Sequence, residues 1–295
     1  MTNLSNPLPP ALKGVRILSL ALNLPGPAAL MRCRQMGADC VKLEPPAGDP
    51  MGHYNKAAYA QLHEGIEVLA TDLKSGEGQQ ALHRELARAD VLLTSFRPSA
   101  FEKLGIAWAT LHGLYPSLSQ VAIVGSPGAR AEEPGHDLTY LADSGLIPGM
   151  ELPATLYADM SGSLMASEAV LQTILLQRGA TGRQPGVLIE VALSEAARYV
   201  ALPRHWGLTE PEGWVGGAHA GYQLYACRDG RVAVAALEPH FAKALCAAAG
   251  LAASDVKTLL SPTTRQLIAA FLLTQTRQQL DTLALAKDIP LHTMI

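Results

Sequence analysis

The sequence predicts an α/β protein, with a large domain built around a mostly parallel sheet and a smaller α+β domain behind it. Three observations predict this class. Short apolar runs alternate with helical segments through the first part of the 295-residue chain, as in parallel sheets covered on both faces. Residues 203–217 combine Pro, Gly and scattered charges without periodicity, which is typical of a linker. Asp229-Gly230 separates two strand-like runs, as in a tight hairpin. We expect domains over residues 1–202 and 218–295.

The strands of the large domain are predicted from runs rich in Val, Ile and Leu. They lie at residues 15–20, 40–44, 68–71, 91–94, 118–124 and 187–191. Helices are expected between and after them, at residues 28–36, 78–89, 108–113, 136–145, 163–176 and 194–202. Gly37 stands where a helix C-cap would place it, and residues 45–65 are expected to be loop-rich. This alternation favours a Rossmann-like sheet whose ligands lie outside the carboxyl ends of the strands.

The smaller domain is predicted to begin with a β-hairpin and to continue as helices. Its strands are expected at residues 222–227 and 232–236, and its helices at residues 240–249, 261–273 and 276–285. The single hairpin followed by helical segments indicates an α+β unit.

Composition excludes several classes of function. The net charge is −3 and no Lys/Arg cluster is present, so we expect no nucleic-acid partner. No apolar run approaches the roughly 20 residues of a membrane span, and the polar, Pro-rich start is not a secretory signal. The four cysteines match neither a zinc motif nor a redox pair, which predicts reduced thiols in a cytoplasmic protein. Only 17% of residues are charged, which favours a buried oligomer surface.

Two polar side chains at predicted helix starts are candidates for chemistry. His136 and Asp159 each follow a turn-rich loop and each sit at a predicted helix start, at or near the first turn. Such a turn carries unpaired N–H groups and partial positive charge, which can stabilise a developing anion. A structural role stays open, because Asp is a favoured N-cap and periodicity cannot show that the two residues lie close together.

Other chemistries lack their motifs. The nine histidines show no metal-ligand spacing, and HExxH, GxSxG, the P-loop and the GxGxxG dinucleotide fingerprint are all absent. We therefore expect no metal and no bound cofactor. Acid–base or carboxylate-nucleophile chemistry remains.

An ordered set of short motifs then identifies a family. They are residues 12–18 with Pro25-Gly26-Pro27, residues 37–44, Asp72-Leu73-Lys74-Ser75, residues 89–92 with Phe96-Arg97-Pro98, residues 103–105, Gly135-His136-Asp137, residues 216–218, Tyr222 with Tyr225, Asp229-Gly230 and residues 236–239. Together they resemble the family III CoA-transferase superfamily, and in particular its α-methylacyl-CoA racemase branch, nearly from end to end.

The resemblance implies a two-base reaction on a 2-methylacyl-CoA thioester, which is the substrate. His136 and Asp159 would stand on opposite faces of the α-carbon, one removing the proton and the other returning it. Glu238 would orient His136, and Asp137 would belong to the same catalytic group. Helix-start N–H groups near Asp137 or Asp159 would stabilise the enolate oxygen.

The resemblance also implies binding residues and an assembly. CoA would be held by Thr71, Leu73, Lys74, Arg97 and Tyr140. An intertwined homodimer is expected, and the family's C-terminal return segment is expected to be missing from this chain.

Two other functions stay open. In the transferase branch the residue matching Asp159 is a nucleophile that forms an acyl anhydride, and the His of Gly-His-Asp is usually absent. A diverged homologue is the second alternative, acting on another acyl carrier or as a non-catalytic partner. It is suggested by residues 63–67, which hold two acids and no Lys or Arg, and by Pro45, which replaces a basic residue.

Overall fold

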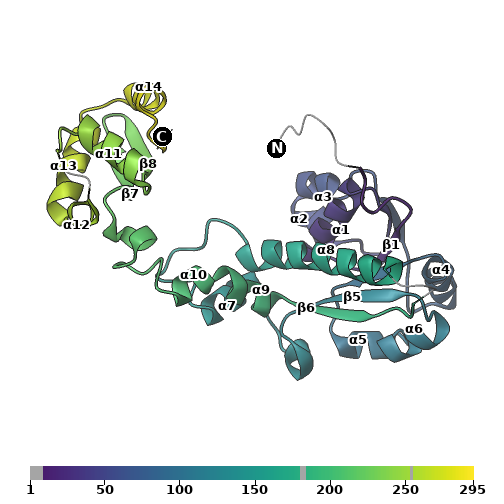
Figure 1. Cartoon of the computed structure of the whole chain (residues 1–295). Coiled ribbons are helices and arrows are strands. Elements are labelled where there is room, and N and C mark those ends of the chain that lie inside the picture. The colour runs from purple at the N-terminus through teal and green to yellow at the C-terminus, as the bar shows by residue number, and fades with distance from the viewer. Residues whose placement is uncertain (1–8, 180–183, 253–254) are drawn as a thin grey trace. The chain divides into compact units, whose positions relative to one another are not determined.

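The structure is a computed structural model that describes residues 9–179, 184–252 and 255–295 (Figure 1). The chain divides between Ala201 and Leu202 into two compact units. Each unit has its own core. Residues 203–217, expected as a linker, include part of the short helix α10 (Leu202–His205) and most of a π-helical turn, η2 (Trp214–Ala218).

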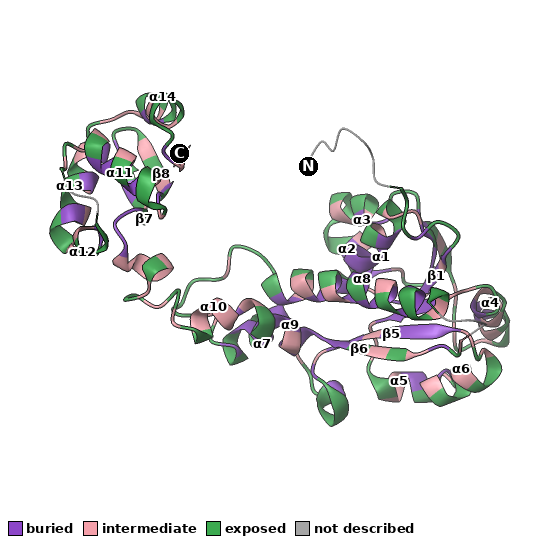
Figure 2. Cartoon of the chain, viewed as in Figure 1, coloured by how far each residue is buried: buried purple, intermediate pink, exposed green. Residues whose placement is uncertain are grey.

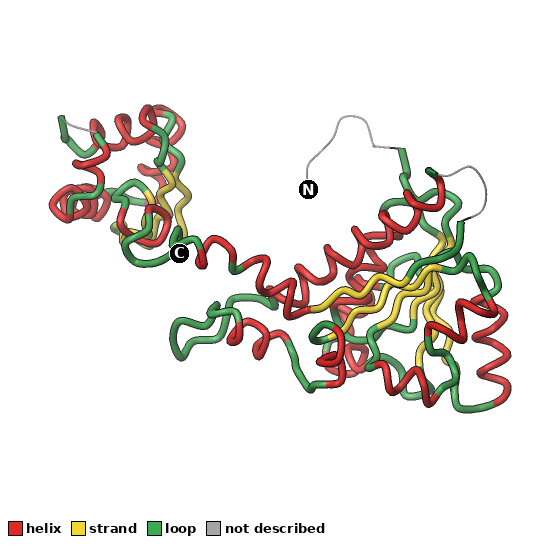
Figure 3. The backbone as a smooth tube through the Cα atoms, turned by 60° about the horizontal axis from the view of Figure 1, so that its bottom comes forward, coloured by secondary structure: helices red, strands yellow, loops and turns green. Residues whose placement is uncertain are grey.

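The first unit is built on a six-stranded sheet in the order β3-β2-β1-β4-β5-β6, seen in yellow in Figure 3. Every neighbouring pair is parallel, which confirms the predicted α/β class. The strands are β1 (Arg16–Ser19), β2 (Asp39–Glu44), β3 (Glu67–Ala70), β4 (Val91–Thr94), β5 (Ser119–Val124) and β6 (Leu188–Ala192). The edge strands β3 and β6 are partly exposed, whereas β4 is buried throughout and β5 nearly so. Figure 2 shows the contrast between β5 and β6.

Helices cover both faces of this sheet because its central strands are apolar on both sides. One core contains Ile17, Leu93 and Val121 and packs against four helices. These are α1 (Pro25–Gln35), α7 (Asp137–Asp143), α8 (Tyr157–Arg178) and α9 (Leu193–Val200). The other core contains Leu18 and Leu92. Its helices are α4 (Gly76–Leu86), α5 (Pro98–Lys103) and α6 (Trp108–Leu114).

The expectation of a loop-rich stretch at residues 45–65 was wrong. Two short helices occupy it, α2 (Pro50–Tyr54) and α3 (Lys56–Leu62). Asp49 caps the first by accepting the N–H of Met51, and Asn55 caps the second by accepting the N–H of Ala58. These helices are too short to show a hydrophobic period, so capping residues were the available signal.

Helix α8 also begins earlier than predicted. The expected start was residue 163, but the helix runs from Tyr157 and includes Asp159 in its first turn. Ser161, Gly162 and Ser163 lower the local helix propensity. Packing overrides it, since Gly162 faces Leu193 of α9.

The second unit contains a three-stranded antiparallel sheet, β7-β8-β9, flanked by helices. Strands β7 (Tyr222–Cys227) and β8 (Gly230–Ala235) form the predicted hairpin, with Cys227 opposite Gly230. Strand β9 (Leu291–Met294) pairs with β8 and was not predicted, because its four residues show no clear alternation. The helices are α11 (Pro239–Ala248), α12 (Val256–Leu259), α13 (Pro262–Leu273) and α14 (Arg277–Lys287).

Two sequence expectations concern the chain as a whole. All four cysteines are free and buried. In the part of the chain that the structure describes, no helix combines the length and apolar character needed to cross a bilayer.

Candidate active site

The candidate site is a cavity of about 680 Å³ at the carboxyl edge of the six-stranded sheet. Its walls include residues 22–25 after β1, 95–97 after β4, and 123–125 at the end of β5. Strands β1 and β4 are neighbours, yet the chain leaves β1 toward β2 on one side and β4 toward β5 on the other. This is the switch point where ligands of open α/β sheets bind.

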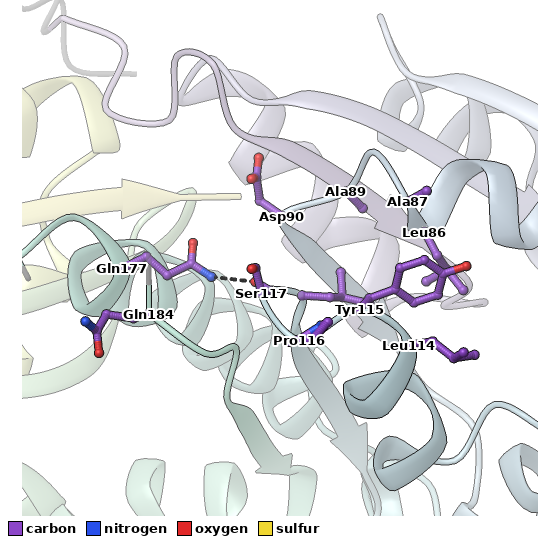
Figure 4. Close-up of a pocket in the computed structure, with 11 residues that line it drawn as sticks. Leu86, Ala87, Ala89, Asp90, Leu114, Tyr115, Pro116, Ser117, Gln177 and Gln184 are labelled. Atoms are coloured by element: carbon purple, nitrogen blue, oxygen red, sulfur yellow. Dashed lines mark hydrogen bonds between the residues drawn. The ribbon is translucent and has the colours of Figure 1, made fainter. Parts of the chain in front are cut away.

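A second cavity, of about 690 Å³, lies at the opposite edge of the sheet (Figure 4). Asp90 is the one charged side chain among its described lining residues, and its carboxylate accepts the N–H of Arg16 at 2.8 Å. The amide of Gln177 donates to the carbonyl of Ser117 at 3.1 Å. Asp90 and Gln177 are thus engaged structurally, and the described lining residues include no pair of acidic and basic side chains.

His136 lines the first cavity and is the N-cap residue of α7. Its backbone N–H donates to Oγ1 of Thr139 at 3.1 Å, and its carbonyl accepts the N–H of Thr139 at 2.9 Å. These bonds fix the turn through the main chain. The imidazole is therefore carried on a rigid backbone at an exposed position on the cavity wall.

Asp159 lines the same cavity from the first turn of α8. Its N–H donates to Oδ1 of Asp137 at 3.0 Å, and Asp137 is itself only 4% exposed. This bond joins the first turns of α7 and α8. The structure thus brings together His136, Asp137 and Asp159, which sequence periodicity could not do.

The environment of Asp159 favours its neutral form. Burial raises its pKa to about 6, the charge of Asp137 acts in the same direction, and His136 offsets part of the effect. An acid of this kind exists in both protonation states near neutral pH, so it can give or take a proton.

Tyr140 is a further polar residue of the cavity lining, and its predicted contact with CoA stays a prediction. Its ring lies against Gly125 and Gly135, where a Cβ atom on either residue would collide with the phenol. Burial raises the pKa of Tyr140, the charge of Asp159 adds to this, and Arg97 opposes it. The hydroxyl therefore stays protonated and available as a donor.

The other predicted binding residues differ in their positions. Arg97 lines the cavity and is the one Lys or Arg among its described lining residues. Thr71, Leu73 and Lys74 are outside that lining. The N–H of Thr71 donates to the carbonyl of Glu44 at 2.7 Å, and Leu73 packs against the α4–α6 core. Glu238, in the second unit, is the exposed N-cap residue of α11, and its role toward His136 stays a prediction.

Sequence reasoning missed part of the cavity wall. Asn23, Tyr54 and Asn55 line it, and two of them belong to the stretch expected to be loop-rich. Asn23 has a left-handed backbone with φ 65°. Nothing in the sequence ties Asn23 to residues 49–58.

One cluster could in principle hold a metal. Among the described residues, Glu44, Asp49 and His63 place ligand-type atoms within 4.8 Å of one another. The Nζ atom of Lys42 lies among them, 2.9 Å from Glu44 Oε1 and 2.6 Å from Asp49 Oδ2. A protein cation therefore already engages these carboxylates.

Comparison with known proteins gives consistent matches. The model of a family described as CoA-transferase family III matches residues 12–294. Alpha-methylacyl-CoA racemase of Mus musculus is 31% identical over 85% of this chain and 68% of its own length. Cinnamoyl-CoA:phenyllactate CoA-transferase of Clostridium sporogenes is 32% identical over 46% of this chain and 36% of its own.

Solved structures share the fold. Rv3272 from Mycobacterium tuberculosis superimposes with a TM-score of 0.80 at 23% identity, covering 97% of this chain and 84% of its own. A CAIB/BAIF family protein from Brucella suis gives 0.78 at 22% identity, covering 96% and 84%. The likeness therefore extends over both units of the chain.

Proposed function

Since the chain belongs to CoA-transferase family III, we propose that it racemises a 2-methylacyl-CoA thioester by removing and returning the α-proton. One observation carries the proposal. His136 and Asp159 line a single cavity, and the pKa of Asp159 is raised to about 6. The similarity to an α-methylacyl-CoA racemase over most of the chain supports this choice.

The reaction needs two groups because inversion delivers the new proton to the face opposite the one that lost it. In one direction the Asp159 carboxylate removes the proton and the His136 imidazolium supplies another. In the other direction the roles exchange. A raised pKa suits Asp159 to both roles, since a carboxyl group of ordinary pKa would be a poor proton donor near neutral pH.

The enolate oxygen needs a hydrogen-bond donor while negative charge develops on it. The N–H of Asp159, one of the donors expected from the sequence, already donates to Asp137. The protonated hydroxyl of Tyr140 lines the cavity and is the donor we assign to this role.

CoA transfer is the second candidate. A carboxylate nucleophile would be Asp159, which would form an anhydride with the acyl group, and similarity to a CoA-transferase supports it. That route gives His136 no role. A diverged homologue with weak CoA binding is the third candidate, supported by the single cation, Arg97, on the described cavity wall.

The test uses one enantiomer of a 2-methylacyl-CoA in deuterated water. We expect deuterium at the α-carbon and loss of optical purity, both measurable by mass spectrometry and chiral chromatography. His136→Ala and Asp159→Asn should each lower exchange at least about 100-fold. Asp143→Asn is the matched control, because this carboxylate at the end of α7 is exposed.

The alternatives give different results. Transfer of CoA to a free acid without exchange of the α-proton would contradict the racemase assignment and support a transferase. This transfer should then be lost in Asp159→Asn and kept in His136→Ala. If calorimetry detects no binding of CoA or its thioester, both the racemase and the transferase assignments are contradicted, and the diverged homologue is favoured.

A further inference from the structure

A group of buried ionisable side chains lies beside the cavity and is not used by the reaction above. It consists of Lys42, Glu44, Asp49 and His63, here called the Lys42 network. Lys42 is 0% exposed, and the other three are below 9%. The Lys42 ammonium has three close partners: Asp49 Oδ2 at 2.6 Å, Glu44 Oε1 at 2.9 Å and His63 Nε2 at 2.9 Å. All three of its hydrogens are thereby used.

The hydrogen bonds of His63 determine the tautomer and the charge of its imidazole ring. Its Nδ1 lies 2.7 Å from the carbonyl of Tyr59. A carbonyl only accepts, so Nδ1 carries the hydrogen and Nε2 offers its lone pair to Lys42. The ring is therefore neutral. Burial lowers the pKa of His63 and the Lys42 charge adds to this, while the Tyr59 carbonyl, Glu44 and Asp49 oppose it.

The network also holds main-chain groups of the cavity wall. The Asp49 carboxylate accepts the N–H of Asn23 at 3.1 Å and the N–H of Met51 at 2.9 Å. Both residues line the cavity. Asn23 has the left-handed backbone noted above, a conformation that Asn tolerates better than most residues other than Gly, and the bond to Asp49 helps to hold it there. The hydroxyl of Tyr59 adds a 3.0 Å bond to Glu44 Oε1.

We propose that the Lys42 network positions the cavity wall formed by the loop after β1 and by α2, and that it does so only while His63 is unprotonated. Lys42 and His63 are thus positioning residues for substrate binding. The identity of that substrate rests on the proposed function. The positional statement does not, because it follows from the bonds between Asp49 and residues 23 and 51.

The physical reason is the direct contact between two nitrogen atoms. If Nε2 of His63 were protonated, two hydrogen-bond donors and two positive charges would face each other in a buried environment, which is unfavourable. One of the two must withdraw. Withdrawal of Lys42 would leave Glu44 and Asp49 without their cation, and a buried charge without a partner is strongly unfavourable.

The substitution His63→Gln tests whether protonation of His63 disturbs the network, and it keeps a hydrogen-bond acceptor for Lys42. A Gln side chain can place Oε1 near the position of Nε2 and does not titrate. His53→Gln is the matched control, because His53 is an exposed histidine of α2 that contacts only the carbonyl of Ala47 in its described hydrogen bonds. Removing Lys42 itself would risk misfolding.

The measurements compare about pH 7.5 with about pH 5, because the pKa of His63 is lowered from the ordinary histidine value of 6.5 and protonation needs a lower pH. In the wild type and His53→Gln, amide exchange of peptides holding Asn23 and Met51 should accelerate at the lower pH after correction for intrinsic rates. KM for the thioester should rise about tenfold. In His63→Gln both quantities should stay nearly constant, while the effect of pH on kcat remains that of the wild type.

Two results would overturn the proposal: unchanged exchange of these peptides in the wild type at the lower pH, or the same response in His63→Gln. A KM that does not follow the exchange data would also overturn the positioning role. Failure of the proposed function is recognised separately, as absence of thioester binding in every variant at both pH values.

Discussion

At the scale of single residues, the raised pKa of Asp159 suits proton transfer but lowers the stability of the folded chain when the carboxyl group is ionised. An acid whose pKa is higher in the folded than in the unfolded chain binds its proton more tightly when folded. Between the ordinary value of 3.8 and about 6, the free energy of unfolding therefore falls as pH rises. Above about pH 6 the full cost remains, and below 3.8 it vanishes because both states are protonated.

Asp159→Asn should therefore stabilise the protein while removing its activity. Asn resembles the protonated acid but loses the favourable charge at a helix N-terminus. We expect a net gain of about 1–2 kcal/mol in the free energy of unfolding above about pH 6. The gain should shrink toward zero near pH 4, as measured by urea denaturation at several pH values. Asp143→Asn, at an exposed position, is the control, and an Asp159→Asn variant less stable than the wild type at neutral pH would contradict the account.

At the scale of elements, the start of α4 fixes the loop that contains the predicted CoA contacts Leu73 and Lys74. A Cβ atom at Gly78 would collide with the main-chain carbonyl of Asp72. The N–H of Gly78 donates to Oγ of Ser75, which caps the helix. Helix and loop therefore share one close contact that only glycine permits.

Gly78→Ala should lower the free energy of unfolding by about 1–3 kcal/mol, because backbone rather than a mobile side chain would have to move. The matched control is Gly76→Ala on the same helix, where a Cβ atom would meet open space. The control should be neutral or slightly stabilising, since Ala favours helix. Chemical denaturation measures both. Equal effects of the two substitutions would show that the contact with Asp72 is unimportant.

The elements that could be predicted are those with a strong local signal. The six strands of the sheet, the hairpin at Asp229-Gly230 and the long helices have clear periodicity or turn residues. Helices α2 and α3 and strand β9 lack such a signal, because each is four to seven residues long and is fixed by caps or tertiary pairing.

The residues of the candidate site also differ in whether they could be predicted from the sequence. His136 and Asp159 could be selected from motifs, and Arg97 follows a predicted strand. The bond between Asp137 and the N–H of Asp159 joins residues 22 positions apart, and no propensity encodes it. The Lys42 network could not be predicted either, because it joins a strand, a loop and a helix through buried charges that sequence patterns treat as surface residues.

At the scale of the whole molecule, the chain carries many large apolar side chains on its surface. Met150 is 100% exposed, Leu152 78% and Leu175 69%, and charged residues are scarce. Such exposure is typical of a surface covered by a partner. We expect a homodimer, as the family resemblance also implies.

Sedimentation velocity should accordingly give twice the chain mass of 31.2 kDa at micromolar concentration. Substitution of Leu152 and Leu175 by Glu should weaken association, because charge is depleted from interface cores. Far-UV circular dichroism would verify that the variants still fold. A monomer over the whole concentration range would contradict this expectation.

The strand order has a consequence for how the protein is made. On one side β1 pairs with β2, but its other neighbour, β4, begins only at Val91. During synthesis the central strand therefore waits with an open hydrogen-bonding edge until β4 has emerged, and the sheet is completed only when β6 follows at Leu188. Unpaired edges of this kind are prone to wrong pairing. The switch point that creates the cavity in the finished protein is thus also an edge that stays unpaired in the nascent chain until β4 has emerged.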